Sequence, residues 1–324
     1  MIRRELIFVV SALALLHPPM ASAQESGRIY RLGFLSSLGR ANPPYGALFD
    51  ELRRLGFIEN QNLMVDPRGF GLPDGRFAEV AAELVKAPVD VIVASGDDAI
   101  RAAQGATATI PILGSADDMV GSGLVASMAH PGGNTTGTSI FSTELDGKRQ
   151  EALTEIVPKA GQIAALADAN TTASSHLQAL QDAAREHGVG LSVYRVATSE
   201  EIAPAIDAAK AAGADALNVL ASPFLRANEQ PIRDRTAALK LPTIYQFPKM
   251  AEAGGLAAYG PRIDELYRTV QARQLGDLLK GAKPADLPIE QPTRFELIIN
   301  LKTAKALGLT VPPNMLDLAD EDIE

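Results

Sequence analysis

The sequence has 324 residues, no cysteine and a formal net charge of −9 at pH 7. Such an acidic chain is repelled by the phosphates of nucleic acids and by anionic membrane surfaces, which argues against either as a partner. Without cysteine there can be no disulfide, no cysteine nucleophile and no lipid anchor on an N-terminal cysteine. The length is sufficient for two hydrophobic cores, so we expect two lobes.

The N-terminus has the pattern of a secretory signal peptide. Arg3 and Arg4 form a positive region, and the apolar run that follows is too short to span a bilayer. An Ala-Ser-Ala sequence ends at Ala23, so residues 1–23 are expected to be removed and the mature chain to begin at Gln24. A retained anchor is one alternative, and export by the twin-arginine route is another. Export by either route, followed by cleavage after Ala23, predicts a periplasmic protein.

From residue 28 onward, strand and helix patterns alternate. The uninterrupted apolar run 89–94 is typical of a strand buried on both faces of a parallel sheet. Asp74 is a candidate helix cap, and Thr198 with Glu201 forms a capping box. Repeated strand–helix units predict parallel sheets with right-handed crossovers. The expected strands are 29–35, 62–67, 89–94, 110–113, 138–141, 163–167, 191–196, 216–220, 243–245 and 255–259. The expected helices are 44–56, 75–86, 146–157, 173–187, 199–212, 226–239 and 263–280, before a strand-to-helix segment over 295–307.

The stretch 110–140 connects the two runs of strand–helix units. It begins as a strand and continues into a small loop that contains Asp117 and Asp118. It ends in the turn sequence 130–137, which leads into another strand. We expect the loop to face a ligand and the end of the stretch to cross between lobes. A short helix is expected between them, with apolar positions Val120, Leu124, Val125 and Met128.

Catalytic and cofactor motifs are missing. The mature chain has three histidines, His130, His176 and His187, and none has the H-x-x-x-H spacing of a metal site on a helix. There is no nucleophile elbow and no P-loop. Residues 121–126 fit a dinucleotide fingerprint but begin seven residues after the strand instead of directly after it. We therefore predict a protein that is not an enzyme and that carries no metal and no cofactor.

The remaining candidates for a site are small polar loops at the carboxyl ends of the predicted strands. Ligands of open α/β sheets bind at that edge, where the N–H groups of the following helices also point. Several aromatic residues fall near the same strand ends and are expected to wall a pocket. The candidate ligand-binding residues are Ser36, Ser37, Ser95, Gly96, Asp97, Ser115, Asp117, Phe141, Ser142, Asp168, Asn170, Ser222, Tyr245, Phe247 and Tyr259.

Several motifs carry a family resemblance that extends over essentially the whole mature chain. They are Ile110-Pro111-Ile112, DMVGSGLV at 118–125, HPGGNTTG at 130–137, AGGL at 253–256, YGP at 259–261, KPADLP at 283–288, QPTRFELIINLK at 291–302 and AKALGL at 304–309. With these motifs the chain resembles the periplasmic substrate-binding proteins of ABC importers, in the group that includes tryptophan- and tyrosine-binding members.

The resemblance implies a type I periplasmic-binding fold, in which three hinge crossings join two doubly wound parallel-sheet α/β lobes. Lobe 1 would comprise 28–139 plus 261–288, and lobe 2 would comprise 140–260 plus 289–324. The lobes would close on a small-molecule ligand, and the closed monomer would dock on an ABC permease of the inner membrane. A sensor-type binding module that feeds a membrane receptor is the alternative, and an exported enzyme is the less favoured one.

Two departures from the family concern the ligand. Members often carry a hydroxyl residue, proline and alanine after the third strand, which suits an α-carboxylate, whereas this chain has Gly-Asp-Asp-Ala at 96–99. Asp117 also replaces a usual hydroxyl residue beside Asp118. Extra carboxylates favour a neutral or cationic, flat, nitrogen-rich solute. An aromatic amino acid, with its ammonium group on an aspartate, is the alternative, and Asp97 also fits a simple helix cap.

Overall fold

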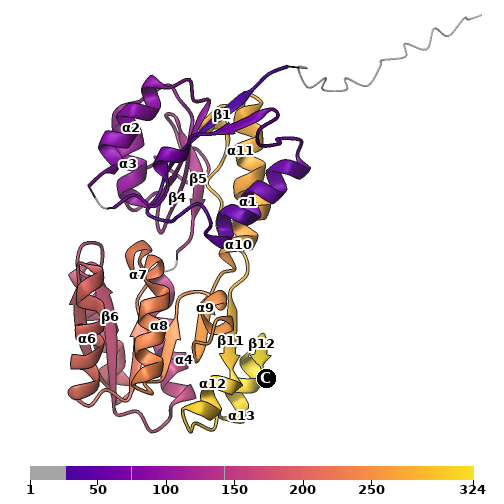
Figure 1. Cartoon of the computed structure of the whole chain (residues 1–324). Helices are drawn as coiled ribbons and strands as arrows, with labels where there is room; N and C mark the ends of the chain where they lie inside the picture. Colours follow the sequence, from indigo (N-terminus) through magenta and orange to yellow (C-terminus); the bar gives the residue numbers. More distant parts are fainter. Residues whose placement is uncertain (1–26, 74, 142) are drawn as a thin grey trace, which may run out of the picture.

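A computed structural model describes residues 27–73, 75–141 and 143–324, which form two α/β lobes, one above the other (Figure 1). The signal-peptide prediction and Ser142 lie outside these residues. The first lobe contains β1 (Tyr30–Leu35), α1 (Pro43–Arg54), β2 (Leu63–Val65), η1 (Pro67–Gly69), α2 (Phe77–Lys86), β3 (Val91–Ser95), α3 (Asp97–Ala106), β4 (Ile112–Ala116), β5 (Thr135–Ser139), α10 (Ile263–Leu266), the π-helical turn η3 (Tyr267–Gln271), α11 (Ala272–Leu279) and η4 (Pro284–Asp286).

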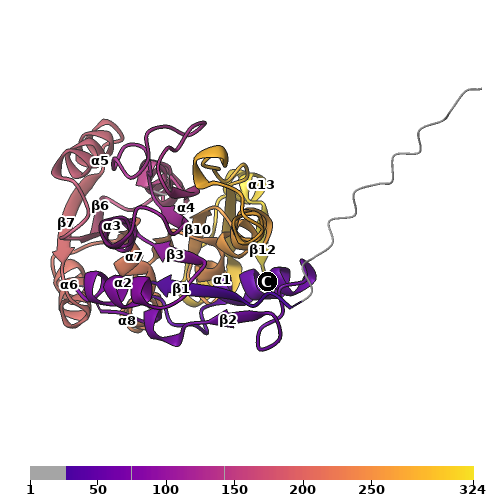
Figure 2. The same ribbon diagram turned by 90° about the horizontal axis from the view of Figure 1, so that it is seen from above.

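The second lobe follows the same strand–helix alternation. It contains η2 (Thr143–Leu145), α4 (Asp146–Ile156), β6 (Gln162–Asp168), α5 (Ser174–Glu186), β7 (Gly190–Val196), α6 (Ser199–Ala211), β8 (Ala216–Val219), α7 (Pro223–Ala227), α8 (Glu229–Ala238), β9 (Thr243–Tyr245), α9 (Pro248–Glu252), β10 (Ala257–Gly260), β11 (Glu296–Asn300), α12 (Leu301–Ala306), α13 (Pro313–Leu318) and β12 (Glu321–Ile323). Seen from above, the two lobes overlap (Figure 2).

The sheet of the first lobe is parallel and is covered on both faces. Its strand order is β2-β1-β3-β4-β5, with α1 and α11 on one side and α2 and α3 on the other (Figure 1). Successive residues of a strand point to opposite faces, so Phe34 packs with Tyr45 of α1 while Leu35 belongs to the cluster around Leu84 of α2. Burial on both faces is the reason that β1 and β3 are mainly apolar, with Arg31 and Ser95 as the exceptions.

The sheet of the second lobe is mainly parallel, in the order β12-β11-β10-β9-β8-β6-β7. It departs from the prediction at β11, which runs antiparallel to β10 with Tyr259 opposite Leu297. The chain enters β11 from the first lobe, at the edge where β10 ends, so β11 has to run back in the opposite direction. α13 and β12 have no counterpart among the predicted elements.

Within the described residues, the chain passes between the two sheets three times. The first passage lies between β5 and α4, the second between β10 and α10, and the third between η4 and β11. The first and third lie side by side, because the Ser139 amide donates to the Glu290 carbonyl at 2.9 Å and the Glu290 amide donates to the Gly137 carbonyl at 3.0 Å. This backbone ladder couples the two connections.

The helix expected around 120–128 is wrong, because the structure has a series of turns there. Oδ1 of Asp118 accepts hydrogen bonds from the amides of Val120 and Gly121 at 3.1 and 2.8 Å. Gly123 then adopts a positive φ of +67°, which ends the helical path after one turn. The apolar side chains of this segment still pack against the first lobe, which accounts for the helix-like spacing in the sequence.

The helix predicted over 226–239 is two helices, α7 and α8, which meet at Asn228. Pro231 lies in the first turn of α8. It has no N–H to donate, and in a continuous helix its ring would clash with the carbonyl of the residue four positions earlier. The capping box of α6 is confirmed, with Thr198 and Glu201 as expected. Asp74 lies outside the described residues, and the cap position of α2 is Arg76.

Gly137 is a position that should tolerate no side chain. Its φ is +145°, and a Cβ atom there would lie 1.8 Å from the carbonyl oxygen of Gly114, its neighbour in β4. We expect Gly137→Ala to lower the free energy of unfolding by about 2 to 4 kcal/mol in chemical denaturation. Gly105→Ala is the control, because that helical position has open space and should gain up to about 1 kcal/mol. Equal stability of Gly137→Ala and wild type would contradict the pairing of β4 with β5.

Candidate functional site

The carboxyl edges of the two sheets face each other, and we call them the facing edges. Asp117, just after β4, accepts hydrogen bonds from the Thr143 amide at 3.1 and 3.2 Å, where the chain enters the second lobe. A Cβ atom at Gly96, just after β3, would lie 3.9 Å from Pro223, which begins α7 after β8. The loops after β3 and β4 therefore lie against the loops of the second lobe.

An interlobe groove lies along these edges, with walls from both lobes. The first lobe contributes Asn42 and Pro43 at the start of α1, and the second contributes Arg226 and Phe247. The guanidinium of Arg226 lies over the Phe247 ring, 5.3 Å from its centroid. Pro44, the residue before Tyr45 in the first turn of α1, lines the same groove as Arg226. The second-lobe wall thus carries an aromatic ring, two basic residues, Arg226 and Lys249, and one acidic residue, Glu229.

A cluster of hydroxyl groups lies on the first-lobe side. Ser95 ends β3 next to β1, where Ser36 follows the pair Leu35–Ala94. The hydroxyls of Ser95 and Tyr267 are 3.0 Å apart, and the Tyr267 ring meets the Tyr45 ring edge-on, with centroids 5.8 Å apart. Burial, with the nearby Tyr267, raises the pKa of the Tyr45 hydroxyl well above its usual range, so it stays protonated at neutral pH.

Tyr45 and Tyr267 were absent from the predicted site. Both belong to helical segments, α1 and η3, whose internal positions read as core in the sequence. The available signal was the position of Tyr45 in the first turn after Pro43 and Pro44, because a first turn lies at the same sheet edge as the preceding strand end.

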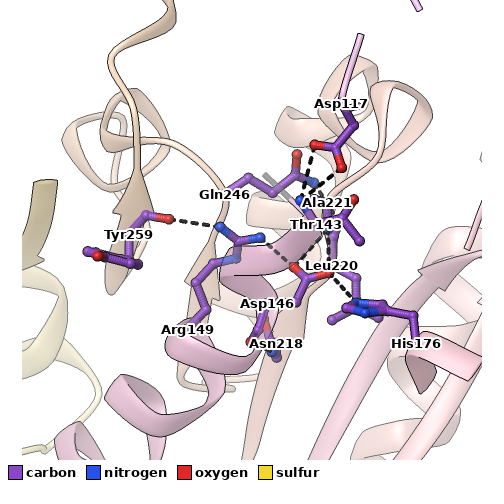
Figure 3. Close-up of polar contacts among 10 residues, drawn as sticks. All are labelled: Asp117, Thr143, Asp146, Arg149, His176, Asn218, Leu220, Ala221, Gln246 and Tyr259. Atoms are coloured by element: carbon purple, nitrogen blue, oxygen red, sulfur yellow. Dashed lines mark hydrogen bonds and ion pairs between the residues drawn. The ribbon is translucent and has the colours of Figure 1, made fainter. Parts of the chain in front are cut away.

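A buried ion pair supports the second-lobe edge (Figure 3). Asp146 and Arg149, one turn apart at the start of α4, are both fully buried and their charged groups are in contact. The other oxygen of Asp146 lies 2.9 Å from Nε2 of His176 in α5. The Asp146 carboxylate also accepts from the Ala221 amide at 3.0 Å, in the loop after β8.

The same pair reaches the second passage between the lobes. Nη1 of Arg149 donates to the carbonyl oxygen of Tyr259 at the end of β10, at 2.9 Å. The Asn218 side chain donates to the Asp146 carbonyl at 3.2 Å. The ends of two strands, β8 and β10, are therefore held by Asp146 and Arg149 (Figure 3). In the sequence this pair is visible only as an Asp and an Arg three residues apart on a helix that follows a crossing. The same spacing fits an ordinary exposed ion pair.

Arg262 anchors the second passage from the other side. Its guanidinium contacts Glu252 of α9 and Glu296 of β11, each at 2.5 Å, and Glu321 of β12 at 3.1 Å. Burial by itself would raise the pKa of Glu252, but Arg262 and Lys249 outweigh it and hold that pKa below its usual value. The cluster joins the second passage to β11, the strand that the third passage enters.

Six of the predicted site residues lie at or beside the facing edges. Asp97, the first residue of α3, is half-buried, and its carboxylate has no hydrogen-bond or ion-pair partner among the described residues. Ser36 is buried, and its hydroxyl accepts from the Leu38 amide at 3.0 Å. The six are Ser36, Ser37, Ser95, Gly96, Asp97 and Phe247.

Other predicted residues have polar groups with partners inside the protein. The Asp168 carboxylate accepts from the Asn170 amide at 2.9 Å and from the Thr171 hydroxyl at 2.7 Å. The Tyr245 hydroxyl is 2.9 Å from the Thr236 hydroxyl, and burial raises its pKa to about 12. These groups close loops or fill the core because the side chain that follows a strand end can fold back as readily as face a ligand.

Four more predicted residues also have structural roles or lie away from the groove. Ser222 caps α7 by accepting from the Leu225 amide at 2.9 Å. Ser115 is buried in β4, 3.3 Å from the Thr138 hydroxyl. Asn170 is exposed, and Tyr259 packs beside the core cluster of α4.

The predicted residues of the first passage lie at a different cavity. Phe141 has a φ of +52°, in the left-handed region, and its amide donates to the Asp117 carbonyl at 2.9 Å. Its side chain lines a cavity with Leu145 and Pro292, between the first and third passages. Phe141 is therefore a hinge-side residue, and the Asp117 carboxylate is committed in part to the Thr143 amide.

A sequence model described as "ABC transporter substrate binding protein" matches residues 44–323. The chain belongs to this family. A similar curated protein, the tyrosine-binding protein of Clostridioides difficile, is 28% identical over 260 residues, which cover 78% of this chain and 73% of that protein.

Solved structures similar to this family member share its fold. A conserved domain protein from Vibrio cholerae has a TM-score of 0.80 at 24% identity, with 91% of this chain and 99% of that one covered. An ABC domain from Streptococcus pneumoniae in complex with L-Trp has a TM-score of 0.76 at 24% identity, covering 91% and 100%. The architecture is thus the type I periplasmic-binding fold, as the sequence motifs predicted.

Across residues 27–73, 75–141 and 143–324, no group of three or more His, Asp or Glu side chains is arranged to hold a metal ion. In the same part of the chain, none of the helices has the length and apolar character needed to cross a membrane.

The buried ion pair generates a stability prediction. Asp146→Ala would leave the Arg149 guanidinium buried without its carboxylate, and we expect the free energy of unfolding to fall by about 3 to 5 kcal/mol. Asp182→Ala breaks a matched but exposed pair with Arg185 and should cost less than about 0.5 kcal/mol. Chemical denaturation of both variants measures the difference. Similar losses would show that Asp146 and Arg149 do not act as a desolvated pair.

Proposed function

We propose that this family member is exported, is cleaved after Ala23, and acts as a monomeric solute-binding component of an ABC importer in the periplasm. It would capture a small nitrogen-containing aromatic solute between its lobes and deliver it to the permease without chemical change. The observation that carries this proposal is the arrangement of the facing edges, which puts Asp97 and the hydroxyl cluster opposite Arg226 and Phe247. Closure of such a groove removes a ligand from water.

The solute we propose is an aromatic amino acid. The names of similar proteins record tyrosine and L-Trp as ligands. The structure also weakens the case for a strongly cationic solute, because the Asp117 carboxylate is turned to the Thr143 amide. Asp97 then remains as an acidic group at the facing edge, which matches the one ammonium group of an amino acid. The ring would lie beside Phe247.

A thermal unfolding screen of the mature protein tests this function. The panel would hold aromatic amino acids, purines and pyrimidines, polyamines, sugars and carboxylates. A ligand at 100 times its Kd should stabilise the protein by about 2.7 kcal/mol, which is visible as a shift in Tm. We expect L-tryptophan or L-tyrosine to give the shift. A shift with purines or polyamines alone would replace the amino acid by a nitrogen-rich base, and a shift with sugars alone would contradict both.

Asp97 provides a more local test. Asp97→Ala should weaken binding of the amino acid by roughly tenfold or more in calorimetric titration, because a hydrogen bond to a charged group is lost. Asp98→Ala is the matched control, since Asp98 is the next residue of the same helical turn but is exposed. Equal affinity of both variants and wild type would remove Asp97 from the site.

A further inference from the structure

The Tyr45 hydroxyl is a buried donor without a visible purpose in the fold. Tyr45 is only 1% exposed, and its hydroxyl has no hydrogen-bond partner among the described residues. A buried polar group left unpaired costs free energy, and a phenylalanine would fill the same space without that cost. The hydroxyls of Ser36, Ser95 and Tyr267 lie near it. Arg226 of the second lobe lines the interlobe groove together with Pro44, the residue before Tyr45.

These groups share one chemical preference. Hydroxyl donors together with a guanidinium suit an acceptor with negative charge, and a carboxylate matches the fork of an arginine. The π-helical turn η3 places Tyr267 in the cluster, and such turns are frequent at functional sites. The donors come from both lobes, so a group held between Tyr45 and Arg226 would join the lobes directly.

The N-terminus of α3 is a poorer place for a carboxylate in this chain. Asp97 and Asp98 occupy its first turn, and their charges repel an anion. Asp97 is nevertheless only two residues from Ser95, a member of the hydroxyl cluster. One ligand with a cationic and an anionic group on neighbouring atoms could therefore bind both regions. Its cation would lie at Asp97 and its anion at the hydroxyl cluster.

We propose that Tyr45 and Arg226 form the carboxylate subsite of the ligand, with the paired hydroxyls of Ser95 and Tyr267 beside Tyr45. The proposal rests on the proposed function, since it assigns the two charged groups of an amino acid to separate parts of the groove. It makes Tyr45 and Arg226 the residues that distinguish an amino acid from the amine that lacks its carboxylate.

The test compares each amino acid with its decarboxylated amine by calorimetric titration of the mature protein. The pairs are L-tryptophan with tryptamine and L-tyrosine with tyramine. We expect wild type to prefer the amino acid by at least about tenfold. Tyr45→Phe and Arg226→Gln should each reduce that preference by roughly tenfold and leave the affinity for the amine unchanged. In the ligand-free protein, Tyr45→Phe should keep or raise Tm, because it removes an unpaired buried hydroxyl.

Tyr245→Phe is the matched control. It also removes a buried tyrosine hydroxyl, but one that is paired with Thr236 inside the second lobe. Its Tm should fall, while its preference for the amino acid should equal that of wild type. This opposite pattern separates a binding role of Tyr45 from a structural one.

The outcomes distinguish the two proposals. If wild type binds the amino acid and both Tyr45→Phe and Arg226→Gln keep the wild-type preference, the carboxylate subsite is wrong and the proposed function stands. If wild type binds no compound of either pair, the aromatic amino acid is wrong as the proposed solute, and the carboxylate subsite fails with it.

Discussion

The arrangement of the second-lobe edge depends on the buried contact between Asp146 and Arg149. Two buried charges are expensive to desolvate, and such a pair is tolerated only when its geometry and its remaining hydrogen bonds are satisfied. Here those hydrogen bonds go to the Ala221 amide and the Tyr259 carbonyl, groups that end two different strands. Because the desolvated pair requires these hydrogen bonds, it holds in place the loops that border the groove.

Hydrogen bonds and ion pairs also hold the three passages between the lobes. A backbone ladder at Glu290 couples the first passage to the third, and the second is held by Arg149 on one side and by Arg262 on the other. These contacts tie the first passage to the third and the second passage to α4 and β11, and the passages are where a hinge between the lobes would lie. Phe141, in the left-handed region at the first passage, is a strained position of the kind that hinges accommodate.

The groove divides its chemistry between the lobes. The first lobe supplies neutral hydroxyl donors and the Asp97 carboxylate, and the second supplies the Arg226 cation stacked on Phe247. A ligand that satisfies both walls gains most when the lobes are closed, which links recognition to the conformation that a permease would meet. The proposed amino acid is a zwitterion, so it would offer its ammonium group to Asp97 and its carboxylate to Arg226.

The sequence by itself determined the alternation of strands and helices, the two lobes and the family, because buried parallel strands require continuous apolar runs and the motifs of the tail are long. It also located the edge of the sheets where a site would lie. Only the tertiary structure decided which side chains at that edge face the groove. Asp168 and Tyr245 follow or end strands just as Ser95 does, yet they turn inward to local partners. Arg226 and the start of α1, where Tyr45 lies, are far apart in the sequence and border one groove only because two lobes fold against each other, so no local pattern could reveal them.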